Sequence, residues 1–229
     1  MSIRILLILF IIIPSCSSDK ITTAEKNEYF GIYKNLISQI FSDETELLKP
    51  PVLKKTNQWL SEFKQPVILI SSLDEKNQAT LVALGNNREK LTWVSSDGIS
   101  LTFDQGVLIA TRGYSQDLLS LKYFNPVGLF GSKKIRYKRV HRYLTGDNKY
   151  DDIVFQCIGK RGKPKPVLFL EYKITIDKFD EDCVSDQHSY KNEYDLLSGT
   201  SVVIESKQWI SPTNKYFRTY NLYAFQSFE

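Results

Sequence analysis

The sequence is poor in the side chains that most catalytic and metal sites need. Its 229 residues include two histidines, three cysteines and one methionine. It contains no GxSxG, HExxH, phosphate-loop or dinucleotide-binding motif, and the spacing of its cysteines and histidines is not that of a zinc site. The sequence therefore predicts no metal and no cofactor, and it favours a protein that is not an enzyme. Because carboxylates are plentiful, a glycoside hydrolase that uses two acids remains an alternative.

Strong net charge and long apolar runs are also missing. The chain has 30 Lys and Arg against 26 Asp and Glu, a formal net charge of +4, which by itself predicts no strongly electrostatic partner. Beyond the first 15 residues, no apolar run approaches the length that spans a membrane. Repeats and low-complexity tracts are absent, so we expect a single β-rich domain over residues 27–229.

The amino terminus has the pattern of an export signal. Arg4 precedes an apolar run at residues 5–13 that is too short for a stable membrane-spanning helix. Ile13-Pro14-Ser15-Cys16 follows and resembles the lipobox of bacterial lipoproteins. This resemblance implies a signal peptide at residues 1–15, acylation of Cys16 and a lipidated tether at residues 16–26. The alternative is an ordinary secretory signal with an incidental cysteine.

The resemblance also carries an expectation about location. Ser17, and not aspartate, follows the cysteine, which by similarity to the usual sorting rule favours the periplasmic side of the outer membrane. The membrane is then a partner through the lipid, and export excludes nucleic acid. Cys157 and Cys183 are an even pair in an exported chain, so we expect a disulfide that stabilises the fold by about 3 kcal/mol. Two unpaired thiols in neighbouring strands are the alternative.

Apolar residues recur every three or four positions across residues 29–41, which predicts an amphipathic helix. We expect it to pack against the protein's own sheet, and insertion into a membrane is the alternative. The prolines at positions 50 and 51 end this segment, and a short second helix is expected within residues 52–63.

From Pro66 onward the apolar period changes to two, and short β-branched runs alternate with turns such as Asp97-Gly98. The short connections predict an antiparallel sheet and leave no room for crossover helices. We therefore predict a mainly β fold: a curved antiparallel meander or half-barrel with one N-terminal amphipathic helix packed on it. The expected strands are residues 67–71, 79–84, 90–95, 99–103, 107–111, 190–196, 201–209 and 216–225, with a hairpin of residues 151–159 and 166–177 turning at Gly159-Lys160-Arg161-Gly162.

Six of the ten residues at positions 133–142 are basic. In a strand, one face would carry Arg136, Lys138 and Arg142, and the other would carry Arg139 and His141. The basic face is either a solvated face that prevents edge pairing or a surface for acidic polysaccharide or anionic lipid head groups. The five acids at positions 177–186 are expected in a solvated turn, because they lack the spacing of a calcium loop.

Residues 92–118 resemble the YjbF/GfcB family, the outer-membrane lipoproteins of group 4 capsule and exopolysaccharide operons. A second matching segment begins at Leu197-Ser198-Gly199 and continues through Ser206-Lys207-Gln208-Trp209. The features that match in the first segment are Trp93, the Ser96-Asp97-Gly98 turn, Leu101, Gly106, Leu108, Thr111-Arg112-Gly113 and Asp117-Leu118.

The resemblance implies an accessory factor in the export or assembly of extracellular or capsular polysaccharide, which acts by binding or scaffolding. Polysaccharide and other export proteins are then its expected partners. Trp93, Thr111, Arg112 and Asp117 are conceivable glycan-binding residues, although structural roles are favoured for them. A carrier of lipid or another hydrophobic ligand in a half-barrel pocket is the alternative function.

Overall fold

The computed structural model describes residues 65–73, 77–87, 90–124, 128–145, 149–170 and 172–226. All of them belong to one compact unit, Leu47–Glu229. The predicted signal peptide, Cys16, the tether and the helices expected at residues 29–41 and 52–63 lie outside the described residues. Within the described part of the chain, no helix is both long and apolar enough to cross a membrane.

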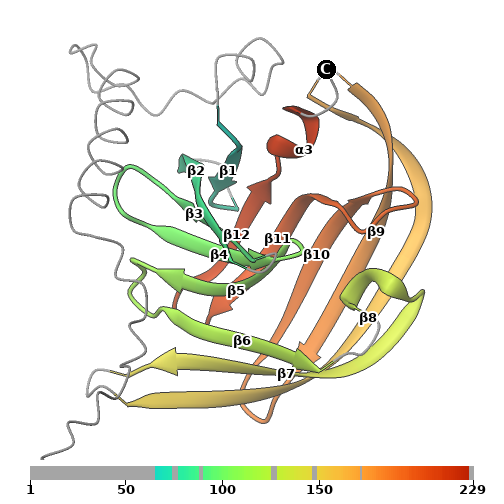
Figure 1. Ribbon diagram of the computed structural model, residues 1–229. Coiled ribbons are helices and arrows are strands. Elements are labelled where there is room, and N and C mark those ends of the chain that lie inside the picture. Colours follow the sequence, from blue (N-terminus) through green and yellow to red (C-terminus); the bar gives the residue numbers. More distant parts are fainter. Residues whose placement is uncertain are drawn as a thin grey trace, which may run out of the picture. The chain divides into compact units, whose positions relative to one another are not determined.

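The described residues form one twelve-stranded antiparallel sheet that curls into a nearly closed, barrel-like shape (Figure 1). The order in the sheet is β5-β4-β3-β2-β1-β12-β11-β10-β9-β8-β7-β6, so every hydrogen-bonded pair is antiparallel. The strands are β1 (Val67–Ser71), β2 (Gln78–Asn87), β3 (Lys90–Val94), β4 (Ser100–Asp104), β5 (Val107–Arg112), β6 (Leu118–Phe124), β7 (Lys134–Leu144), β8 (Tyr150–Phe169), β9 (Tyr172–Val184), β10 (Ser189–Leu197), β11 (Val203–Ser211) and β12 (Lys215–Tyr220), and the short helices are η1 (Leu129–Gly131) and α3 (Tyr223–Gln226). The predicted mainly β fold with a curved antiparallel sheet is confirmed.

Local sequence explains the hairpins at the start of the sheet. Gly98 and Gly106 have φ angles of 87° and 84°, a region that glycine enters without steric cost. Register shifts in several strand pairs, such as the one between Arg161 and Pro164, bend the strands and help the sheet to curl.

The concave side of the sheet is filled with its own side chains. One buried cluster joins residues from strands across the sheet, including Leu81, Phe103, Tyr137, Phe155 and Phe217. A second, smaller cluster lies on the opposite face of β1, since its Val67 and Leu69 alternate with Ile68 and Ile70 of the first cluster. It joins β1, β11 and β12 to the end of the β8–β9 hairpin and to residues beside α3. Figure 1 shows α3 at the same end of the sheet as the tip of that hairpin.

Two local predictions were wrong. Gly159 to Gly162 do not turn the chain, because they lie within the twenty-residue strand β8, and the chain turns at Leu170, which has φ 53°. Position 159 requires glycine because a Cβ there would lie 2.3 Å from Cζ of Phe179. The strand expected at residues 216–225 ends at Tyr220, and the short helix α3 follows it.

Candidate functional site

The outer face of β7 carries a row of exposed cations. Lys134, Arg136 and Lys138 are exposed, whereas Tyr137, Arg139 and His141 on the opposite face are buried, so the alternation expected of this strand is confirmed. Residues two apart in a strand are separated by about 6.8 Å. On the neighbouring strand, the exposed Lys160 lies directly opposite Lys134. We call Lys134, Arg136, Lys138 and Lys160 the basic row.

The cations of the basic row differ from Arg139 and Arg142 of β7, which form ion pairs with Glu181 and Asp152. None of the row's four side chains makes an ion pair with another residue that the structure describes. Lys134 and Lys160 lie directly opposite each other as like charges, an arrangement that destabilises a strand pair. On its other side Lys160 lies opposite Asp180 of β9, without forming an ion pair with it. A polyanion that bound along β7 would remove this repulsion.

Arg142, which the sequence places on the same face, is engaged elsewhere. Its Nε and Nη2 donate to the two oxygens of Asp152, both at 2.7 Å. Its guanidinium also lies 3.8 Å from the centre of the Tyr150 ring. These hydrogen bonds lower the pKa of Asp152, and they leave Arg142 without a free charge for a ligand.

Two other candidates from the sequence lie apart from the basic row. Trp93 is 4% exposed and belongs to the core. Arg112 is exposed, but its Nη1 donates to the backbone carbonyls of Thr111 and Leu118. The structure therefore gives both residues packing or bracing contacts within the sheet.

The segment from Thr111 to Leu118 connects the two ends of the sheet. Asp117 accepts hydrogen bonds from the Thr111 hydroxyl at 2.8 Å and from the Gly113 amide at 3.0 Å. The Thr111 oxygen in turn accepts from the amide of Leu118 at 2.9 Å. Side chains of β5 and of the following loop thus hold β5 against β6, the two strands at the ends of the hydrogen-bonded order.

The two segments that carry the family resemblance touch each other across the core. Gln208 of β11 donates through Nε2 to the carbonyl of Gly106 at 2.9 Å and accepts from the amide of Leu108 at 2.8 Å. One side chain therefore satisfies two backbone groups about a hundred residues away along the chain. This contact gives Gly106, Leu108 and Gln208 a shared structural role.

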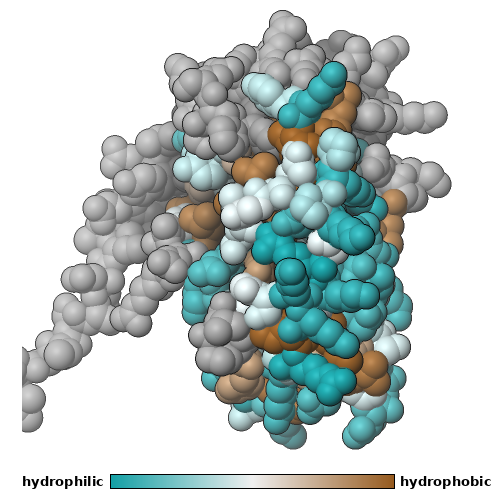
Figure 2. All heavy atoms as spheres, turned by 90° about the vertical axis from the view of Figure 1, so that its right-hand side faces the viewer, coloured by the Kyte–Doolittle hydropathy of each residue, from teal (hydrophilic) through white to brown (hydrophobic). Residues whose placement is uncertain are grey.

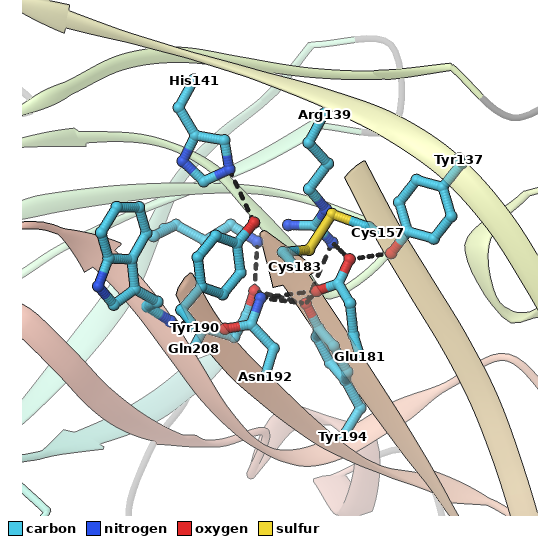
Figure 3. A network of polar contacts seen from close by, with 12 residues as sticks. Tyr137, Arg139, His141, Cys157, Glu181, Cys183, Tyr190, Asn192, Tyr194 and Gln208 are labelled. Carbon is cyan, nitrogen blue, oxygen red and sulfur yellow. Dashed lines mark hydrogen bonds and ion pairs between the residues drawn. A yellow bond between two sulfur atoms is a disulfide. The ribbon is translucent and has the colours of Figure 1, made fainter. Parts of the chain in front are cut away.

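The inner face of β7 contributes to a buried polar network (Figure 3). Arg139 Nη2 lies 2.6 Å from Glu181 of β9, whose carboxylate also accepts from Tyr137 and from Asn192. Burial raises the pKa of Glu181, and the hydrogen bonds from Asn192 and Tyr194 act in the opposite direction. The expectation of a solvated acidic turn was therefore wrong for four of the five acids, which lie on strand β9 and alternate between buried and outer positions. Only Asp186 lies in the exposed turn that follows β9.

His141 is held neutral in the same interior. The Tyr143 hydroxyl donates to the carbonyl of Ile210 at 2.8 Å, so its oxygen accepts from Nδ1 of His141 at 3.0 Å. The other ring nitrogen, Nε2, then accepts from the Tyr190 hydroxyl at 3.0 Å. Burial lowers the pKa of His141 well below its usual range, and the charge of Arg139 lowers it further.

Cys157 and Cys183 form a disulfide between directly opposite positions of β8 and β9. The pairing expected from the even cysteine count is present. Glu181 lies close enough that its carboxylate and the two sulfurs are within 4.8 Å of one another. Because both sulfurs are bonded to each other and Glu181 pairs with Arg139, this cluster has no free ligands for a metal ion.

Sequence reasoning found the cations of the outer face and missed the polar network of the inner face. Tyr190, Asn192, Tyr194 and Gln208 are all buried members of that network. The signal that could have found them is polar or Tyr residues at every second position of β10, where a core strand would ordinarily carry aliphatic ones.

The fold and this site define an all-β domain with a filled polar and aromatic interior and a cationic outer strand. The chain belongs to the family described as group 4 capsule polysaccharide lipoprotein gfcB, YjbF, whose sequence profile matches residues 42–222. The chain is also similar in structure to the hypothetical lipoprotein YmcC from Escherichia coli (K12), with a TM-score of 0.64 and 15% identity over 81% of this chain and 92% of that one. At this identity the likeness concerns the fold alone. No curated protein matches the chain.

Proposed function

We propose that the protein is a lipid-anchored accessory factor in the export or assembly of extracellular or capsular polysaccharide. Membership of the capsule lipoprotein family supports the pathway, and the lipobox-like sequence ending at Cys16 supports the anchor. The predicted location is the periplasmic side of the outer membrane. The protein acts by binding or scaffolding, with no chemistry of its own.

The observation that carries the binding step is the basic row. Four exposed cations that form no ion pair within the described part of the chain lie on adjacent, directly paired strands. Strands β7 and β8 pair in register over eleven positions, from Lys134 with Lys160 to Leu144 with Tyr150, so the spacing of the cations is fixed before a ligand arrives. Acidic groups repeated along a polysaccharide are the matching chemistry.

Such a site binds weakly at each contact and gains from repetition. An exposed ion pair contributes up to about 1 kcal/mol, so single sugars would bind poorly. A long chain presents many acidic groups, and the lipid anchor concentrates many copies of the protein on one surface, so avidity provides the affinity. The interaction should weaken with added salt.

The interior argues against the alternative of a hydrophobic carrier. A carrier needs an apolar cavity on the concave side of the sheet, but this position holds large buried side chains such as Phe155, Phe179 and Tyr194. Among them lies the buried Arg139–Glu181 ion pair. An apolar ligand could offer neither hydrogen bonds nor charge to these two side chains.

The experiment is a binding titration with polygalacturonate as an acidic probe and dextran as a neutral one. Arg136→Glu combined with Lys138→Glu should weaken polygalacturonate binding about tenfold. Lys90→Glu combined with Lys173→Glu is the matched control, because it makes the same change of net charge at exposed positions outside the basic row. Equal losses in both double variants, or equal binding of both probes, would rule out the basic row as the site.

A further inference from the structure

Exposed apolar side chains lie beside and between members of the basic row on the same outer face. Phe124, Val154, Ile158 and Val184 are 60%, 41%, 40% and 57% exposed. They come from β6, β8 and β9, and we call them the apolar patch. Figure 2 shows the face on the right-hand side of Figure 1, where a hydrophobic area in the lower half is bordered by hydrophilic surface.

The strand register shows that these side chains are neighbours. Val184 of β9 lies directly opposite Gln156 of β8, and Val154 and Ile158 are the residues that precede and follow Gln156 on that face. Directly opposite side chains have Cβ atoms about 5 Å apart, and diagonal ones about 7–8 Å. The half-buried Val140 lies opposite Val154 and extends the patch across β7 toward Phe124.

Lysines are interleaved with the apolar residues on the side of β6. Lys138 lies directly opposite Phe124, and Lys122 lies directly opposite Val140. Both lysines are exposed and make no ion pair with any residue in the described ranges. Their aliphatic stems can lie along apolar surface while the charged ends stay in a polar layer.

We propose that the apolar patch and Lys122 rest against an anionic lipid surface. A convex sheet face with apolar residues and flanking lysines matches the headgroup region of a bilayer, where apolar side chains reach the acyl boundary and lysines meet phosphates. Four partly exposed side chains give a weak contact by themselves. The chain belongs to a lipoprotein family, and an anchor supplies the high local concentration that makes a weak contact sufficient.

This contact goes beyond the proposed function, because it fixes how the domain lies on the membrane. With the patch seated on lipid, Lys138, which lies between Phe124 and Gln156, faces the headgroups, and the cations Lys134 and Lys160 at the far end of the row stay accessible beside the membrane. Polysaccharide that passes close to the membrane would then meet the cations directly.

The test uses the full chain isolated from the cell envelope and reconstituted into phosphatidylcholine vesicles with or without phosphatidylglycerol. Ile158→Trp places a fluorescent reporter in the patch, and Val202→Trp places one at an exposed apolar position between β10 and β11. Brominated lipids should quench the reporter at position 158 about twofold more than the reporter at position 202, and more strongly with phosphatidylglycerol present. Adding Val154→Ser and Val184→Ser, which remove apolar area without adding charge, should abolish the difference.

Equal quenching of the two reporters would overturn the proposal. If the reporter at position 158 responded to polygalacturonate and not to brominated lipid, the surface would belong to a glycan and the lipid contact would be refuted. Neither result depends on the proposed function, since the variants Val154→Ser and Val184→Ser leave all four cations of the basic row in place and add no charge beside them. Polygalacturonate binding by those variants therefore separates a failure of the lipid contact from a failure of polysaccharide binding.

Discussion

Arg139 of β7 and Glu181 of β9 form an ion pair at 2.6 Å in the core, where their side chains are 1% and 0% exposed. Removing either charge from water is costly, and only the close opposite charge and the surrounding hydrogen bonds compensate for it. Nε of Arg139 has no hydrogen-bond partner among the residues that the structure describes, so the hydrogen bonds of the pair are incomplete. The two residues are therefore expected to depend on each other.

Arg139→Met should lower the free energy of unfolding by about 3–5 kcal/mol, because it leaves Glu181 buried without a compensating charge. Combining it with Glu181→Leu should recover part of this loss, since the double variant buries no charge. Urea denaturation of the single and double variants measures both effects. A double variant that loses the sum of the two single losses would show that the residues act independently.

His141 should make the protein sensitive to acid. The pKa of His141 is lowered in the folded state, whereas a histidine in an unfolded chain titrates near pH 6.5. Below that pH the unfolded chain binds one more proton than the folded protein, so the free energy of unfolding falls as the pH falls, by up to about 1.4 kcal/mol per pH unit. In urea denaturation between pH 7.5 and pH 5, the free energy of unfolding of His141→Gln should fall less with decreasing pH than that of the wild type. Parallel curves for the two proteins would contradict this explanation.

Gln208 should be a stability residue. Gln208→Ala leaves the Leu108 amide and the Gly106 carbonyl without their partner in a buried position, which should cost about 1–3 kcal/mol. Hydrogen exchange at the Leu108 amide should speed up as well. Gln187→Ala, at an exposed position, serves as the control and should change stability by less than about 0.5 kcal/mol. Unchanged exchange at Leu108 in Gln208→Ala would show that the contact does not protect this amide.

Gly159 should tolerate no side chain while Phe179 is present. Gly159→Ala would bring its Cβ within 2.3 Å of the Phe179 ring, and the resulting strain should cost about 1–3 kcal/mol. Phe179→Leu should destabilise the wild-type background by leaving a cavity, and it should destabilise the Gly159→Ala background less. Thermal denaturation of the four proteins completes the cycle, and additive losses would exclude a steric conflict between the two positions.

Much of the sheet could be predicted because local pattern and final structure agree. The period of two located β1 to β5 within a few residues, and the Asp97-Gly98 dipeptide marked a true turn. The outer position of Arg136 and Lys138 followed from the alternation along one strand. These are properties of neighbouring residues, which a sequence displays directly.

The remaining features depend on contacts between distant strands. Gly159 is required because Phe179 packs over it, yet the segment Gly159-Lys160-Arg161-Gly162 has the composition of a turn. Glu181 lies in an acidic run that suggests solvent, and only its approach to Arg139 of β7 explains its burial. The partners of a buried polar group cannot be predicted before the strand order is known.

The most direct test of the central claim is the amount of polysaccharide, released and retained, in a deletion strain complemented with different forms of the protein. Wild type should restore release, whereas Cys16→Ala should not, because the proposed anchor is lost. Arg136→Glu with Lys138→Glu should fail as well, while Lys90→Glu with Lys173→Glu should succeed. If the deletion leaves release unchanged, the proposed role in polysaccharide export is wrong.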